Sequence, residues 1–135
     1  MFDQETIHKL DKLARENSWT YPQLFEALKN AGVDRYEVDV LKHEIKYVGG
    51  GVTVPMPAPD GWVPLEKAER FNALSLTQAL ERVQKGDTTY PQFLAEIAAA
   101  GVSFYRVDMR PRTVTYHGPT REDKLVEKVP PVKTS

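Results

Sequence analysis

The chain has 135 residues, with 18 basic and 19 acidic side chains and a net charge of -1. This is the length of one domain, and the near-zero charge provides no global field that would gather nucleic acid or an anionic membrane. Cysteine is absent, which excludes disulfides, thiolate nucleophiles and cysteine-based zinc sites. The start of the chain lacks an apolar signal segment, and no run approaches the roughly 18 apolar residues of a membrane span. We therefore expect a cytoplasmic protein that contacts neither membrane nor nucleic acid.

Residues 1–50 predict two helices followed by a β-hairpin. Apolar residues at helical spacing predict the first helix over 3–16. Thr20 and Gln23 have the spacing of a capping box, so a second helix should span about 21–31. After this helix the apolar period changes from about 3.6 to about 2 residues, which is typical of strands.

The predicted hairpin alternates apolar with charged residues, so that one face should be covered by helices and the other should be polar. With a turn centred on Lys42 and His43, Asp39 would face Lys46 across the strands. Aromatic and β-branched residues suit a covered face, and we interpret them as packing residues. In the two hairpins these are Tyr36, Val38, Ile45, Tyr47, Tyr105, Val107, Val114 and Tyr116.

A proline-rich connector is expected over 51–74, because closely spaced prolines favour extended chain with turns. Its beginning, 52–54, has the composition of a short strand. Residues 65–72 could form a short helix. We expect Trp62 to fix the connector against the rest of the fold.

The second unit, 75–119, predicts the same order of helix, helix and hairpin. Ser75 and Gln78 have capping-box spacing at the start of its first helix. Its hairpin is expected to turn at Pro111 and Arg112, which would place Asp108 opposite Thr115. The final segment should be a charged tail over 120–135, with at most a short edge strand near 124–129.

The two units repeat one pattern with an offset of 69 residues. Residues 20–49 and 89–118 align without a gap, and 12 of these 30 positions are identical, which indicates an internal duplication. One copy alone would bury too little apolar surface to be secure, so both copies should share one core. The sequence predicts an α+β fold, in which a duplicated helix–helix–hairpin unit forms a mainly antiparallel sheet with helices packed on one face.

The repeated Thr-Tyr-Pro-Gln segments at 20–23 and 89–92 are each followed by Ala-Gly-Val and Tyr-x-Val-Asp. With the proline-rich middle, they resemble the YbcV-like family of small bacterial and prophage-borne proteins, some of which carry the label phage envelope protein. The resemblance covers nearly the whole chain. It implies a bacterial, prophage-borne protein, and it assigns no activity to any residue.

The polar face of the predicted sheet is the candidate binding surface. It would carry Asp39 and Lys46 from the first hairpin, and Arg106, Asp108 and His117 from the second. Both copies place an aspartate at the same strand position, although aspartate is disfavoured in strands. A solvated face joined by cross-strand pairs would explain the same residues. If the copies pair through their first strands, the two aspartates would lie close together; we expect another pairing, in which each aspartate serves its own hairpin.

Other patterns carry little chemistry. His117 would lie diagonal to Asp108 and could be oriented for acid–base chemistry, but the pattern indicates no nucleophile. The three histidines lack metal-ligand spacing, so we expect no metal.

The glycines at 49–51 precede a strand rather than a Lys-Ser/Thr helix start, so they are no phosphate loop and we expect no cofactor. Acidic neighbours dilute the basic cluster that contains Arg106, which argues against nucleic-acid binding.

These patterns favour a non-enzymatic cytoplasmic binding or interaction protein. Its partner would be another protein, a second copy in a homodimer, or a small ligand. The alternative is a small-molecule-binding protein or an enzyme, with its site on the polar sheet face or under the proline-rich connector at 55–64.

Overall fold

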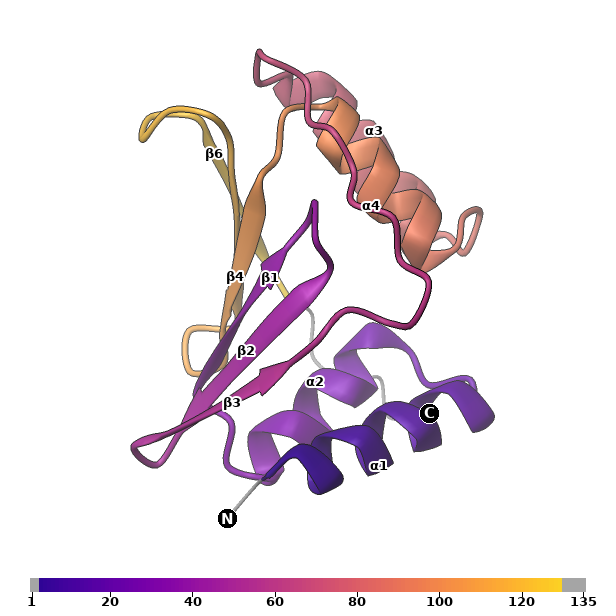
Figure 1. The fold of residues 1–135 in the computed structure, drawn as a ribbon, viewed down its shortest axis with the longest axis vertical. Helices are drawn as coiled ribbons and strands as arrows, with labels where there is room; N and C mark the ends of the chain where they lie inside the picture. Colours follow the sequence, from indigo (N-terminus) through magenta and orange to yellow (C-terminus); the bar gives the residue numbers. More distant parts are fainter. Residues whose placement is uncertain (1–2, 130–135) are drawn as a thin grey trace.

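The computed structural model describes residues 3–129, which form four helices and one six-stranded antiparallel sheet. The α+β class is therefore as predicted, and all four helices lie on one face of the sheet (Figure 1). The elements in chain order are α1 (Gln4–Glu16), α2 (Tyr21–Asn30), β1 (Arg35–Asp39), β2 (Glu44–Gly49), β3 (Val52–Met56), α3 (Ala73–Gln84), α4 (Tyr90–Ala99), β4 (Phe104–Asp108), β5 (Thr113–His117) and β6 (Lys124–Lys128).

The helices begin where side chains cap their free N–H groups. Asp3 accepts a hydrogen bond from the Thr6 N–H at 2.8 Å, the predicted capping box at Thr20 of α2 is present, and α4 has an equivalent box at Thr89. The helix predicted from Ser75 is present as α3, but its predicted capping box was wrong: the N-cap is Asn72, whose side chain accepts from the Ser75 N–H at 3.0 Å. Asparagine caps a helix as well as serine does, and the Ala and Leu that follow it favour helix.

The strand order is β3-β2-β1-β4-β5-β6, so the two hairpins meet along β1 and β4. In this central pair Glu37 lies opposite Arg106, and Tyr36 and Val38 lie opposite Val107 and Tyr105. Glu37 and Arg106 are themselves 69 residues apart (106 minus 37). Residues that are 69 positions apart in sequence, such as Tyr36 and Tyr105, therefore lie symmetrically on either side of the Glu37–Arg106 pair.

Both hairpins differ in register from the prediction. Asp39 faces Glu44 rather than Lys46, and Asp108 faces Thr113 rather than Thr115. Each turn is longer than predicted, so every cross-strand pair shifts by two positions. The alternation of faces is unchanged, because a shift of two keeps each side chain on its side of the sheet.

The longer first turn has a local cause. The Asp39 carboxylate accepts hydrogen bonds from the N–H groups of Leu41 and Lys42, both at 3.0 Å. The Asp39 carbonyl accepts from the His43 N–H at 2.8 Å, and His43 has a positive φ of 55°. Aspartate commonly closes turns in this way, so the strand ends at Asp39 instead of continuing into the turn.

The connector after β3 lies extended over 65–72, and the short helix predicted there is absent from this described segment. The Ala68 N–H donates to the Ala98 carbonyl at 3.0 Å, and the Asn72 N–H donates to the Ala100 carbonyl at 2.8 Å. Carbonyls at the C-terminal end of a helix have no N–H partner within that helix. The non-helical connector can donate its N–H groups to these α4 carbonyls, whereas a helix over 65–72 would use most of its N–H groups internally. The predicted role of Trp62 is confirmed, because its indole N–H donates to the Leu41 carbonyl at 3.1 Å.

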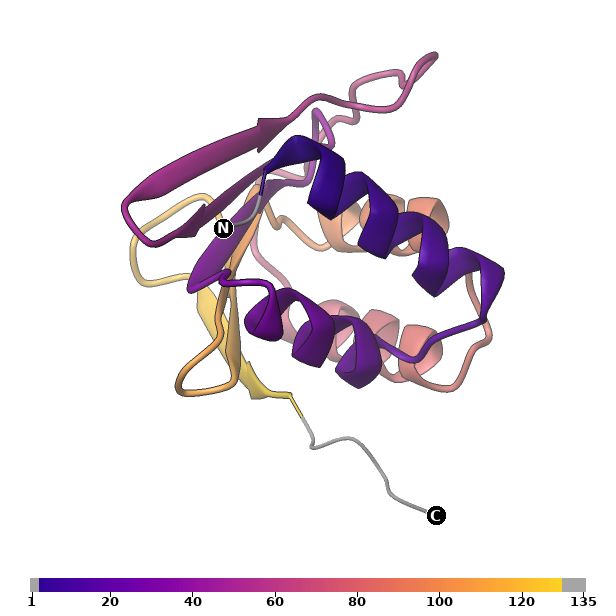
Figure 2. The same cartoon turned by 90° about the horizontal axis from the view of Figure 1, so that it is seen from below.

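The buried side chains of both halves form one cluster between the sheet and the helices. α1 packs against α2 and α3 against α4, which gives two separate helix pairs above the sheet (Figure 2). Each hairpin turn reaches the second helix of the other half. The Arg112 guanidinium lies 4.6 Å from the Phe25 ring centroid and pairs with Glu26, while the His43 ring lies 5.5 Å from that of Tyr90.

Within residues 3–129, no helix combines the length and the apolar character that a bilayer crossing would need.

Candidate functional site

The five residues predicted for the polar sheet face do not form one site. Asp39 lies opposite Phe104, and Asp108 lies opposite Arg35 at the other end of the β1–β4 pair. The two carboxylates are therefore apart, as expected, but the expected strand pairing was wrong, because the two halves do pair through their first strands. The antiparallel register separates them. Asp108 instead accepts from Arg106 Nε at 3.0 Å.

His117 and Lys46 also occupy separate places on this face. The His117 ring stacks on Phe104 with centroids 4.5 Å apart, so its predicted diagonal position beside Asp108 was wrong. Burial lowers the pKa of His117, and the nearby Lys124 lowers it further. Lys46 lies opposite Glu37 beside a shallow hollow of about 260 Å³. This face has the pattern of a solvated surface with cross-strand pairs.

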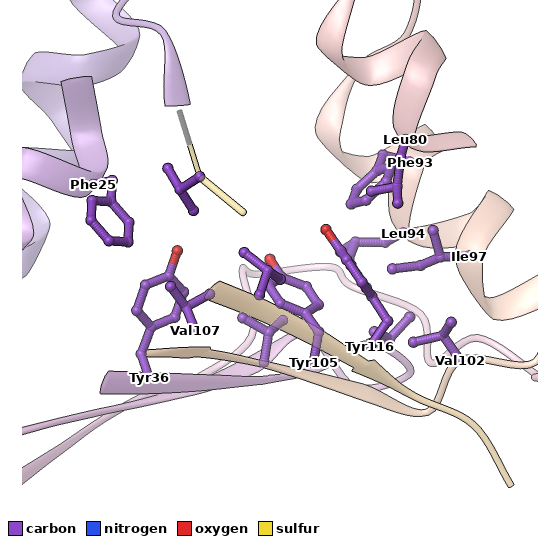
Figure 3. Close-up of a cluster of buried hydrophobic side chains, with 14 of the residues drawn as sticks. Phe25, Tyr36, Leu80, Phe93, Leu94, Ile97, Val102, Tyr105, Val107 and Tyr116 are labelled. Atoms are coloured by element: carbon purple, nitrogen blue, oxygen red, sulfur yellow. The ribbon is translucent and has the colours of Figure 1, made fainter. Parts of the chain in front are cut away.

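The sequence interpretation missed a cluster on the covered face. All six tyrosines of the chain converge there, four from strands and two from the first residues of α2 and α4. Figure 3 shows three of them rising from the sheet, between Phe25 on one side and Leu80 and Phe93 on the other. We call this the tyrosine cluster; it consists of Tyr21, Tyr36, Tyr47, Tyr90, Tyr105 and Tyr116.

Four of these hydroxyls are paired. The hydroxyls of Tyr21 and Tyr36 lie 2.6 Å apart, and so do those of Tyr90 and Tyr105. Both pairs join residues 15 positions apart in sequence. Each pair links the start of a helix to a central strand, so it fixes a helix end above the sheet.

The other two hydroxyls are open. Those of Tyr47 and Tyr116 make no hydrogen bond to any described part of the chain, and the two residues are 9% and 5% exposed. Their rings pack on Tyr36 and Tyr105, with centroid distances of 5.2 and 5.4 Å. Tyr21 and Tyr90, at the starts of α2 and α4, are 40% and 38% exposed as residues. The tyrosine cluster thus offers both aromatic surface and hydrogen-bonding groups to a ligand.

Burial raises the pKa of every tyrosine in the cluster, that of Tyr90 to about 12. Nearby carboxylates add to these shifts. Glu127 contributes to the raised pKa of Tyr116, and Asp11 contributes to that of Tyr47. At neutral pH all six hydroxyls therefore stay protonated and can donate hydrogen bonds.

Glu127 is a further candidate site residue that was not predicted from the sequence. It lies on β6 opposite Val114, half-buried on the covered face, and accepts a hydrogen bond from the Gln84 amide at 2.8 Å. Burial raises the pKa of its carboxyl group, and the bond from Gln84 opposes this rise. A signal was present, because alternation from Leu125 to Val129 places Glu127 on the apolar side of the strand.

His43 lies beside the cluster and is packed against Trp62, with ring centroids 4.6 Å apart. Its Nδ1 is buried and has no hydrogen-bond partner among the described residues. Burial lowers its pKa, and the Asp11 carboxylate opposes this shift. Within residues 3–129, His, Asp and Glu side chains form no group of three or more that could hold a metal ion.

Comparison with known proteins gives relatives without an assigned activity. A family model described as "Protein of unknown function (DUF1398)" matches residues 9–128, which include all of the tyrosine cluster and Glu127. Uncharacterised proteins of Mycobacterium bovis and Mycobacterium tuberculosis are 31% identical to the chain over 112 residues. The match covers 73% of this chain and 60% of each relative, so the chain spans less than two thirds of the relatives' length.

Proposed function

This chain belongs to the DUF1398 family, whose function is unknown, and we propose that it is a non-enzymatic protein that binds a small molecule at the tyrosine cluster. The observation that carries this proposal is the convergence of all six tyrosines on one place, with two hydroxyls left open. A core that needs only packing is better filled by Phe or Leu, whose side chains have no polar atoms. Aromatic surface with a few fixed polar groups is typical of small-molecule sites.

The protonation state of the cluster favours binding over catalysis. A general base works best when its pKa lies near the operating pH. Burial raises the pKa of these tyrosines, that of Tyr90 to about 12, so their hydroxyls donate hydrogen bonds but do not accept protons. The residues that the sequence suggested for acid–base chemistry, His117 and Asp108, lie apart on the opposite face.

We also propose that the two halves arose by duplication. Support comes from the two tyrosine pairs, each 15 residues apart, and from the symmetric register about Glu37 and Arg106. Duplication would have placed one open hydroxyl, Tyr47 or Tyr116, in each half of the cluster. A cytoplasmic location, a homodimeric state and a prophage-borne origin stay predictions from the sequence.

A thermal-shift screen with a library of neutral, cationic and anionic metabolites tests the proposal. We expect some members to raise the melting temperature of the wild type, and the double variant Tyr47→Phe/Tyr116→Phe to lose most of this shift. The matched control is Lys46→Ala/His117→Ala, which alters the polar face and should keep the shift. If the polar-face variant loses the shift while the tyrosine variant keeps it, the proposed site is wrong.

A further inference from the structure

We propose that the ligand of the tyrosine cluster is an organic cation, an amine or a quaternary ammonium, whose charge lies beside Glu127. This inference rests on the proposed function and deepens it by naming the chemical class of the ligand.

The first support is the environment of the Glu127 carboxylate. It is half-buried, and its hydrogen-bond partner is the neutral amide of Gln84 at 2.8 Å. Among the described side chains, no lysine or arginine forms an ion pair with it. Removing a carboxylate from water without a cation is unfavourable. A bound cation would supply the missing charge.

The second support is the position of this carboxylate relative to the tyrosines. In the β5–β6 pair Val114 lies opposite Glu127 and Tyr116 lies opposite Leu125, so Glu127 and Tyr116 share the covered face. The charge of Glu127 also raises the pKa of both Tyr116 and Tyr21. The hydroxyl of Tyr116 has no partner in the described chain, and Tyr21 is 40% exposed as a residue. A cation beside Glu127 would therefore also meet aromatic surface. Aromatic rings attract ammonium groups through their electron-rich faces, most strongly where water is partly excluded.

The third support is the sign of the charge around the whole cluster. Among the described side chains, the charged groups that shift the tyrosine pKa values are Glu127 and Asp11, and both are acidic. Asp11 acts at the other side of the cluster, on Tyr47 and Tyr90. Beside Glu127 the local field therefore attracts a cation and repels an anion. The chain as a whole is nearly neutral, so this field is a local property of the site.

A matched set of probes separates the effect of charge from the effect of shape. The set contains choline, the alcohol in which a carbon replaces the nitrogen of choline, and the carboxylate of the same skeleton. Butylamine, butanol and butyrate form a second set for primary amines. Binding to the full chain is followed by NMR of isotope-labelled tyrosine rings, which reports on the cluster alone because all six tyrosines belong to it.

We expect at least one of the two cations to shift the signals of Tyr116 and Tyr21 saturably. We expect that cation to bind at least about tenfold more tightly than its uncharged counterpart, and Glu127→Gln to remove most of this difference. Glu44→Gln removes the same charge from the exposed polar face, and it should leave the affinity within about twofold. The Glu127→Gln variant keeps an oxygen that can accept from Gln84, so it should remain folded.

Three outcomes would overturn the inference. If the alcohol or the carboxylate binds the tyrosines as tightly as the cation, the class is wrong while the proposed ligand site stands. If a cation binds equally well to the Glu127→Gln and wild-type proteins, Glu127 does not hold the charge. If neither cation moves a tyrosine signal, the inference fails, and the library screen with the Tyr47→Phe/Tyr116→Phe variant decides the proposed function separately.

Discussion

The tyrosines of the cluster divide into two kinds by what their hydroxyls do. Those of Tyr36 and Tyr105 lie deep in the fold, and each is paired with a tyrosine at the start of a helix. Those of Tyr47 and Tyr116 have no partner in the described chain. The same residue type therefore serves stability at four positions, and at the other two its hydroxyl has no partner in the described chain.

Removing one hydroxyl of each kind tests this division. Tyr105→Phe breaks the bond to Tyr90, and it should lower the free energy of unfolding by about 1 kcal/mol. Tyr116→Phe removes an open hydroxyl from a similar strand position, and it should change that free energy by less than about 0.5 kcal/mol. Urea denaturation of both variants measures the difference. Equal losses would show that the two hydroxyls are not distinct in role.

Glu127 should make the stability of the protein depend on pH. Its pKa is raised in the folded state above the ordinary value of 4.5, mainly by burial. At a pH where the carboxyl group is ionised in both the folded and the unfolded protein, it therefore destabilises the fold. This effect disappears as the pH falls below 4.5. Gln84 donates a hydrogen bond to it, Val114 lies opposite it on β5, and its charge raises the pKa of Tyr116 and Tyr21.

Glu127→Gln should accordingly raise the melting temperature at neutral pH, and the gain should shrink to nothing toward low pH. Thermal unfolding of the variant and the wild type across this range measures the gain. A variant that is less stable than the wild type at neutral pH would show that the carboxylate has a stabilising partner. A gain in stability combined with a loss of cation binding is typical of a residue kept for function.

At the scale of the elements, the sequence predicted what depends on local pattern. The capping box at Thr20, the repeat of its Thr-Tyr-Pro-Gln segment at Thr89 and the alternation of the strands predicted helices and sheet faces that the structure shows. The registers were wrong because Asp39 closes a longer turn through its own side chain. The helix predicted over 65–72 is absent from that segment because the end of α4 offers carbonyls that an extended chain satisfies. Both errors depend on hydrogen bonds, from the turn N–H groups to Asp39 and from the connector to the end of α4, that the residue pattern alone does not show.

The contact between the connector and the end of α4 can be tested at Gly101. This residue has a φ of 94°, and an added Cβ would lie 2.5 Å from the Arg70 carbonyl oxygen. Gly101→Ala should therefore combine backbone strain with a clash, and it should lower the free energy of unfolding by more than about 2 kcal/mol.

The matched control is Gly86, which has a φ of 77° and no atom within 4 Å of an added Cβ. Gly86→Ala should show backbone strain alone, about 1 kcal/mol. Chemical denaturation of both variants gives the comparison. A loss at Gly101 no greater than that at Gly86 would mean that the connector moves aside at little cost.

At the scale of the whole molecule, the tyrosine cluster exists only because the two halves pair through β1 and β4. This pairing puts Tyr36 and Tyr105 in adjacent positions at the centre of the sheet, opposite Val107 and Val38. The sequence showed tyrosines with strand periodicity, and packing was a sufficient interpretation of them. Their convergence depends on the strand order and on both registers, which no local pattern fixes.

The halves should not fold separately. The turn of each hairpin packs on the second helix of the other half, through Arg112 with Glu26 and His43 with Tyr90. A fragment of residues 1–56, or one of residues 73–135, would expose the central strand and lose these contacts. We expect circular dichroism of either fragment to show no cooperative thermal transition. A fragment that unfolds cooperatively near the melting temperature of the full chain would contradict a shared core.

The most direct test of the central claim is to locate a bound small molecule on the protein. A compound that shifts the melting temperature in the library screen is titrated into the full chain, and its contacts are mapped by NMR of labelled tyrosine rings and backbone amides. If the ligand binds at the tyrosine cluster, we expect saturable changes at the rings of Tyr47, Tyr116 or both. Changes confined to the polar face around Lys46, Arg106 and His117, with unmoved tyrosine signals, would contradict it.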